Sequence, residues 1–169
     1  MNRTIKFKKN LIFKRILFLI ILTITFYIIF SFSAQDGEKS GTLSEKITEI
    51  IVNIISKIKT MDDSTKIFYI QKLHPIIRKL AHFSIYTVVG FSIMGFMCTF
   101  DIRNVFKFIT SFSIGVIYAI TDEIHQSFIP GRCASIMDVG IDSLGVLTGI
   151  FGLIVLIIFL EAIVNWFKR

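Results

Sequence analysis

The chain has 169 residues, of which 53% are hydrophobic and 18% are charged, and its mean hydropathy is +0.72. This apolar share exceeds that of ordinary soluble domains and all but excludes a water-soluble monomer. The net charge of +7 comes without a basic, aromatic-interleaved module, so the sequence gives no support for nucleic acid as a partner. Neither cysteine belongs to a Cys-x-x-Cys pair, and cysteine-based zinc or redox chemistry is therefore unsupported as well.

Four segments are long and apolar enough to cross a lipid bilayer, which takes roughly 20 residues per helix. They lie at about 12–32, 80–100, 105–124 and 139–159. Because lipid offers the backbone no hydrogen-bond partners, these spans are expected to be helices. The sequence therefore predicts an all-α, multi-pass membrane protein with about four transmembrane helices. A cleaved signal peptide is the alternative for the first span, although its apolar run is longer than such peptides usually have.

The charges that flank the spans predict an orientation. Basic residues crowd the N-terminus: Arg3, Lys6, Lys8, Lys9, Lys14 and Arg15. By the positive-inside rule this end lies in the cytoplasm, and an even number of spans returns the C-terminus there. The expected parts are a basic N-terminus with the first span (1–33), an extracytoplasmic segment (34–79), a three-helix core (80–160) and a cytoplasmic tail (161–169).

Residues 34–79 form the one sizeable segment outside the predicted spans. Thr42 and Glu45 fit a helix capping box, and apolar residues follow at helical spacing: Leu43, Ile47, Ile50, Ile51, Ile54, Ile55 and Ile58. This pattern predicts an amphipathic helix, which either lies at the outer membrane surface or packs on the domain to bury its isoleucines. After a break at 62–65, we expect a short helix that ends near His74 and Pro75.

The predicted topology brings polar residues from three span ends to the outer face of the membrane. They are Lys79, His82, Tyr86, Asp122, Glu123, His125, Gln126, Asp138 and Asp142. Charged groups at membrane depth are costly, and they usually pair or mark function. Asp138 and Asp142 share a helical stripe with Gly145, Gly149 and Gly152, which would let helix backbones approach and turn both acids away from lipid. We therefore expect a polar cavity that opens outward.

Several residues in this cluster have structural interpretations beside the functional ones. Arg132 follows a Pro-Gly turn and either binds a phosphate or carboxylate or neutralises Asp138 or Glu123. Ser135-x-x-Asp138 fits a helix cap, which alone would explain Asp138.

A divalent metal is a further interpretation of the same cluster. Asp122-x-x-His125 together with His82 offers imidazole and carboxylate ligands. The spacing matches no specific metal motif, and hydrogen-bonded histidines are commoner. The cofactor is left open by the sequence.

Taken together, three motifs resemble the VanZ-like family. The first is Arg78-Lys-x-x-His82-Phe-x-x-Tyr86 followed by Gly90; the second is Asp122-Glu-x-His125-Gln-x-Phe128-x-Pro130-Gly-Arg132; the third is Ser135-x-x-Asp138-x-x-x-Asp142-x-x-Gly145 with Gly149. Phe32-Ser-x-Gln35 with Ser40 and Ser44 is similar to the early segment of that family. The resemblance covers about residues 30–150 and implies a small multi-pass protein of the bacterial plasma membrane. It also implies a link to resistance against the glycopeptide teicoplanin, without a defined reaction.

Two functions remain open at this stage. The first is an enzyme acting on a lipid-linked or cell-envelope substrate, with His82, Asp122, Glu123 and His125 as catalytic residues. In it, His125 or Glu123 is the general base, Asp122 orients a histidine, and Arg132 and Lys79 hold an anionic headgroup. The second is a non-catalytic accessory protein that binds an envelope precursor, a lipid headgroup or the antibiotic, or whose cluster is mainly structural. Its contacts are drawn from Lys79, Tyr86, Gln126, Arg132, Asp138 and Asp142.

Overall fold

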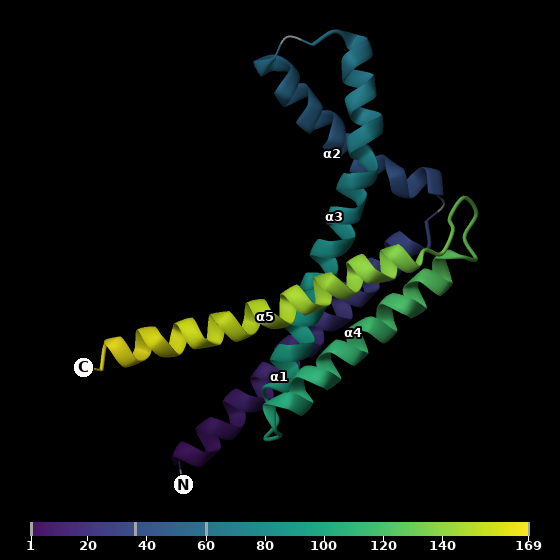
Figure 1. Cartoon of the computed structure of the whole chain (residues 1–169). Coiled ribbons are helices and arrows are strands. Elements are labelled where there is room, and N and C mark those ends of the chain that lie inside the picture. Colours follow the sequence, from purple (N-terminus) through teal and green to yellow (C-terminus); the bar gives the residue numbers. More distant parts are fainter. Residues whose placement is uncertain (1, 36, 60, 169) are drawn as a thin grey trace.

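The computed structural model describes the backbone of residues 2–35, 37–59 and 61–168, and the side chains of most of them. The side chains at 1–9, 36–41, 43, 58, 60 and 169 lie outside this description, and with them Ser40, Leu43, Ile58 and the first basic residues. Five helices follow one another: α1 (Asn2–Ser33), α2 (Gly37–Ile58), α3 (Asp63–Met97), α4 (Asn104–Gln126) and α5 (Ile136–Trp166) (Figure 1).

Four of these helices are long and apolar enough to cross a membrane: Asn10–Ser33, Asp63–Met97, Asn104–Gln126 and Ile136–Trp166. Large apolar side chains cover their outer surfaces, for example Phe13, Ile20, Ile117 and Phe159, each more than half exposed. In water such a surface would be unfavourable, whereas against lipid chains it carries no penalty. The all-α membrane fold with four spans is thereby confirmed.

The helices pack most closely where α3 and α5 cross (Figure 1). A Cβ atom on Gly149 would lie 1.9 Å from the backbone oxygen of Thr87, and one on Gly145 would lie 2.5 Å from that of Phe83. The two backbones are therefore in direct contact, as the small-residue stripe predicts. Gly152 is the exception, because nothing lies within 4 Å of its Cβ position.

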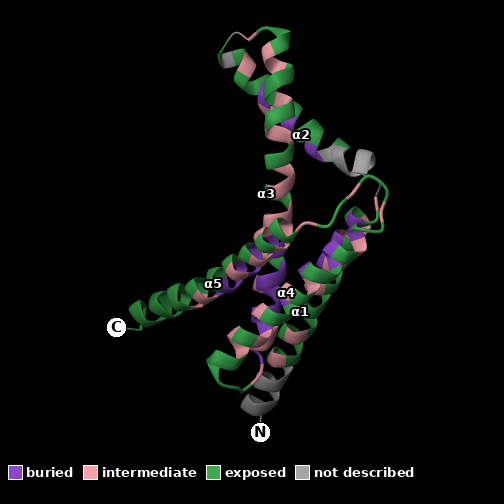
Figure 2. Ribbon diagram, turned by 45° about the vertical axis from the view of Figure 1, so that its right-hand side comes forward, coloured by how far each residue is buried: buried purple, intermediate pink, exposed green. Residues whose placement is uncertain are grey.

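The buried core surrounds this crossing. Five completely buried residues form its centre: Tyr86 and Val89 from α3, Ala119 from α4, and Val146 and Ile150 from α5. Figure 2 shows the buried residues along the inner contacts, while the C-terminal half of α5 projects away from the other helices and is exposed.

In the N-terminal half of α1, Arg15 links this helix to the turn after α3. Its guanidinium donates to the hydroxyl and the backbone oxygen of Thr99 at 3.0 and 3.1 Å. It also lies over the Phe100 ring, 4.3 Å from the centroid. These contacts fix the register of α1 against α3.

Two predictions about the segment between the first spans are wrong. Helix α2 begins at Gly37, so Thr42 lies inside the helix and cannot cap it. Helix α3 runs through Pro75 to Met97, so no short helix ends there. A proline removes one backbone hydrogen bond from a helix. Here α2 packs along this part of α3, with Ser44 Oγ 2.8 Å from His74 Nε2, and the continuous helix is retained.

The break before α3 lies where the sequence predicts it. Asp62 is the residue before the helix, and the hydroxyls of Ser64 and Thr65 donate to its carboxylate. These hydrogen bonds favour the ionised form and lower the pKa of Asp62 from 3.8 to about 2. The carboxylate therefore stays charged at the positive end of the helix dipole.

Helix α2 presents several of its isoleucines outward. Its buried line consists of Ser44, Thr48 and Val52, which face α3, whereas Ile50 and Ile54 are 59% and 56% exposed. The interpretation in which α2 buries its isoleucines on the domain is wrong for these two residues. An outward apolar face on an amphipathic helix is the arrangement that suits a membrane surface.

The α3–α5 crossing generates a stability prediction. Gly149→Ala should destabilise the protein by about 1–3 kcal/mol, because the new methyl group meets the backbone of α3. Gly152→Ala is the matched control on the same helix, where the methyl group has open space. Thermal unfolding in one detergent measures both, and equal effects at the two positions would contradict the close crossing.

Candidate functional site

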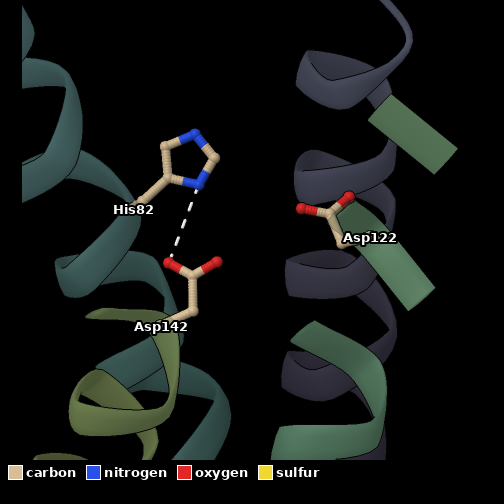
Figure 3. Close-up of side chains that lie close together, drawn as sticks. All are labelled: His82, Asp122 and Asp142. Atoms are coloured by element: carbon tan, nitrogen blue, oxygen red, sulfur yellow. Dashed lines mark ion pairs between the residues drawn. The ribbon is translucent and has the colours of Figure 1, made fainter. Parts of the chain in front are cut away.

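Three side chains from three helices extend toward one another beside the α3–α5 crossing (Figure 3). His82 comes from α3, Asp122 from α4 and Asp142 from α5, and one nitrogen or oxygen atom of each lies within 4.8 Å of the others. His82 Nδ1 lies 3.8 Å from Asp142 Oδ1. The predicted convergence of these three residues is thus present in the structure.

Asp122 is held in place by two donors. The Tyr86 hydroxyl donates to Asp122 Oδ2 at 3.3 Å, and the Gln126 amide donates to the same oxygen at 3.0 Å. The Gln126 amide also donates to Ser33 Oγ at 3.4 Å, which connects α4 to the end of α1. All four residues are buried. One carboxylate oxygen of Asp122 is therefore engaged in orienting the side chain.

Asp142 has a different environment. It is completely buried, and neither of its carboxylate oxygens accepts a hydrogen bond from the described residues. Burying an ionised carboxylate without hydrogen bonds is strongly unfavourable. The side chain that faces it is His82, whose Nδ1 lies 3.8 Å from Asp142 Oδ1. This contact is an ion pair when the imidazole is protonated, and it is longer than a hydrogen bond.

Residues at the rim of the site have structural partners. Lys79 Nζ lies 3.3 Å from Asp138 Oδ1, with both side chains more than a third exposed. Ser135 Oγ accepts a hydrogen bond from the Asp138 backbone at 3.3 Å, so the predicted cap is confirmed. Glu123 accepts from the Ser135 backbone at 2.9 Å and fixes the α4–α5 loop against α4.

Arg132 does not pair with Asp138 or Glu123 in the described structure, so the ion-pair interpretation is not borne out. Its Nη2 group donates to the backbone oxygen of Phe32 at 2.8 Å, while Nε and Nη1 have no hydrogen-bond partner among the described residues. The preceding Gly131 has a φ of 76°, a conformation that glycine adopts readily. Partial burial, together with the charge of Arg78, lowers the pKa of Arg132 from its very high ordinary value.

His125 is turned away from the cluster. Its ring stacks on Phe30 of α1, with centroids 5.0 Å apart, and its Nε2 atom has no hydrogen-bond partner among the described residues. It lines neither of the two cavities described below. Of the residues proposed as catalytic, the structure therefore brings together His82 and Asp122, with Glu123 nearby and His125 apart.

Two cavities meet at the site. A polar cavity of about 240 Å³ lies between α3, the end of α4, the α4–α5 loop and the start of α5. It is lined by Pro75, Arg78, Lys79, His82, Glu123, Gln126, Gly131, Arg132, Cys133, Asp138, Ile141 and Asp142. A more apolar cavity of about 160 Å³ lies between α1, α2 and α3, lined by Ile29, Phe32, Ser33, Ser44, Ile47, Ile77, Arg78, Ala81, His82, Ile85 and Arg132. Arg78, His82 and Arg132 border both.

Arg78 was missing from the site residues expected from the sequence, although its position carried a usable signal. Arg78, His82 and Tyr86 follow one another at intervals of four residues and so lie on one helix face. The apolar cavity had no comparable signal, because it depends on how three helices diverge.

The chain belongs to the VanZ/LLP1 family, whose model matches residues 18–160. The match covers more than half of the chain and includes every residue of the two cavities, and it confirms the resemblance found in the sequence. No curated protein and no solved structure matches the chain at a significant level.

The contrast between Asp142 and Gln126 generates a second prediction. The measurement uses protein from which a chelator has removed any bound metal ion. Asp142→Asn should leave its free energy of unfolding within about 1 kcal/mol of the native value or raise it, because a charge without hydrogen bonds is removed. Gln126→Leu should lower it by about 1–3 kcal/mol, because buried Asp122 and Ser33 lose a donor. Chemical denaturation in detergent measures both. A larger loss for Asp142→Asn than for Gln126→Leu would show that Asp142 is a structural residue.

Proposed function

We propose that this VanZ/LLP1 family protein binds an anionic, lipid-linked envelope compound at the outer face of the bacterial plasma membrane. The observation that carries the proposal is the junction of a polar and an apolar cavity at Arg78, His82 and Arg132. A ligand with a charged headgroup and a hydrocarbon part can occupy both cavities at once. Sites of this kind combine mostly apolar walls with a few placed polar groups.

The cationic groups of the polar cavity favour an anionic headgroup. Arg78, Lys79 and Arg132 line it, but Lys79 is already paired with Asp138. Arg132 retains Nε and Nη1 without hydrogen-bond partners among the described residues, and each can donate a charge-assisted hydrogen bond to a phosphate or carboxylate oxygen. Arg132 and Arg78 are thus the residues that would hold the headgroup.

The positive-inside rule supports the proposed orientation. Lys14, Arg15, Arg103 and Lys107 lie near the end of the bundle that is far from the site. This end would be cytoplasmic, with both termini, and the two cavities would open toward the cell exterior. Because the family resemblance implies a link to teicoplanin resistance, occupation or modification of an envelope precursor at that side is the proposed connection to resistance.

A binding measurement tests the proposal. Purified protein should bind a short-chain polyprenyl phosphate, and Arg132→Gln should weaken the affinity by about 10–100-fold, since a charge-assisted hydrogen bond is worth about 1.5–3 kcal/mol. Arg103→Gln is the control, because Arg103 is an exposed arginine at the other end of the bundle. Microscale thermophoresis in detergent gives the affinities.

The same measurement separates the two halves of the site. Ala81→Leu narrows the apolar cavity. It should therefore weaken binding of the polyprenyl phosphate more than binding of inorganic phosphate, which has no hydrocarbon chain. Equal affinities for native protein and Arg132→Gln would refute the headgroup assignment. Equal binding of a neutral polyprenol would refute the requirement for an anion.

Antibiotic susceptibility provides a cellular prediction. In a teicoplanin-sensitive host, the native protein should raise the inhibitory concentration of teicoplanin, and Arg132→Gln at a matched membrane level should not. Vancomycin, measured in parallel, shows whether protection is selective. Equal protection by the native protein and by Arg132→Gln would show that resistance does not depend on Arg132 in the cavities. Absence of protection by the native protein would remove resistance from the proposal.

A further inference from the structure

The cluster of His82, Asp122 and Asp142 has the composition of a metal site. It contains one imidazole and two carboxylates, which together suit first-row divalent ions such as Zn²⁺ and Mn²⁺. The three side chains come from α3, α4 and α5, so each ligand is fixed by a separate helix. This set differs from the one considered from the sequence, because Asp142 takes the place of His125.

Asp142 supplies an independent reason to expect a ligand. Its side chain is completely buried among the helices, both carboxylate oxygens lack hydrogen bonds within the described chain, and one of them faces His82 (Figure 3). A protonated His82 would neutralise one carboxylate of the cluster, whereas a divalent ion would neutralise those of both Asp142 and Asp122. The cation therefore accounts for both buried acids.

The separation of His82 and Asp142 is compatible with an ion between them. The 3.8 Å from His82 Nδ1 to Asp142 Oδ1 exceeds hydrogen-bond length. Two ligands of a tetrahedral zinc ion, each roughly 2.0–2.2 Å from the metal, lie about 3.3–3.6 Å apart. A small side-chain adjustment brings the pair to that separation.

The surroundings of Asp122 resemble the support that metal ligands usually have. Tyr86 and Gln126 both donate to Oδ2, and neither donates to Oδ1. Such hydrogen bonds orient a ligating carboxylate and leave its other oxygen for the metal. We propose that this protein binds one divalent transition-metal ion, preferentially Zn²⁺, through His82, Asp122 and Asp142. The polar cavity, which His82 and Asp142 line, gives access to the ion.

Zinc titration of the full-length protein tests this proposal. Chelator-treated protein in detergent is titrated with Zn²⁺ by calorimetry, and the metal content is measured after removal of free ion. One Zn²⁺ should bind per chain, and His82→Ala and Asp142→Asn should each weaken binding by at least about 100-fold. His125→Ala should bind as the native protein does, because His125 lies against Phe30. Tyr86→Phe should weaken binding by about 10-fold through the orientation of Asp122.

The outcomes of the Zn²⁺ titration are distinguishable from those of the polyprenyl phosphate binding measurement. Arg132→Gln should bind Zn²⁺ normally, since Arg132 is not a ligand, even where it fails to bind a polyprenyl phosphate. Zn²⁺ should also raise the thermal stability of the native protein and leave that of Asp142→Asn unchanged, which controls for misfolding. Absence of stoichiometric Zn²⁺ on the native protein, or equal affinities for His82→Ala and His125→Ala, would overturn the proposal.

Discussion

The direct backbone contact between α3 and α5 is the constraint on which the site depends. Gly145 meets the backbone oxygen of Phe83, the residue after His82, and Gly149 meets that of Thr87 one turn further along α3. Asp142 lies one turn before Gly145 on α5. With a larger residue at these glycines the helices would separate, and His82 and Asp142 would move apart with them. The packing of the bundle and the geometry of the site are therefore set by the same contact.

The close packing of the helices also keeps charged residues away from lipid. The exposed surfaces of α1, α4 and α5 are apolar, whereas Asp122, Glu123, Gln126 and Asp142 are buried between helices. A carboxylate exposed to hydrocarbon would be far costlier than one that faces a polar cavity. Part of this polar network is structural, because Gln126 connects α4 to Ser33 and Glu123 fixes the loop at Ser135. Asp142 accepts no hydrogen bond within the described residues, and its charged neighbour is His82, at 3.8 Å.

Much of the fold follows from the sequence, because length and hydropathy suffice to place helices that face lipid. Periodicity likewise placed Asp122 and Asp142 toward the other helices. It could not predict the rotation of α4 that turns His125 onto Phe30, since the side-chain direction depends on which helix packs alongside. Pro75 illustrates a second limit. A proline normally indicates a helix boundary, and only the packing of α2 along this part of α3 shows why the helix continues.

The distribution of charge in the polar cavity connects the two proposals. Lys79 is paired with Asp138, and Glu123 is engaged with the loop, which leaves Arg78 and Arg132 as the cationic groups beside the apolar cavity. Asp142 supplies negative charge at the other side of His82, with Asp122 close by. An anionic headgroup placed over Asp142 alone would be repelled by that carboxylate. A divalent ion held by the two acids would cancel this repulsion and offer an open coordination position to the same headgroup that the arginines bind. With both proposals combined, the buried acids and the arginines would act on one ligand although they carry opposite charges in this small cavity.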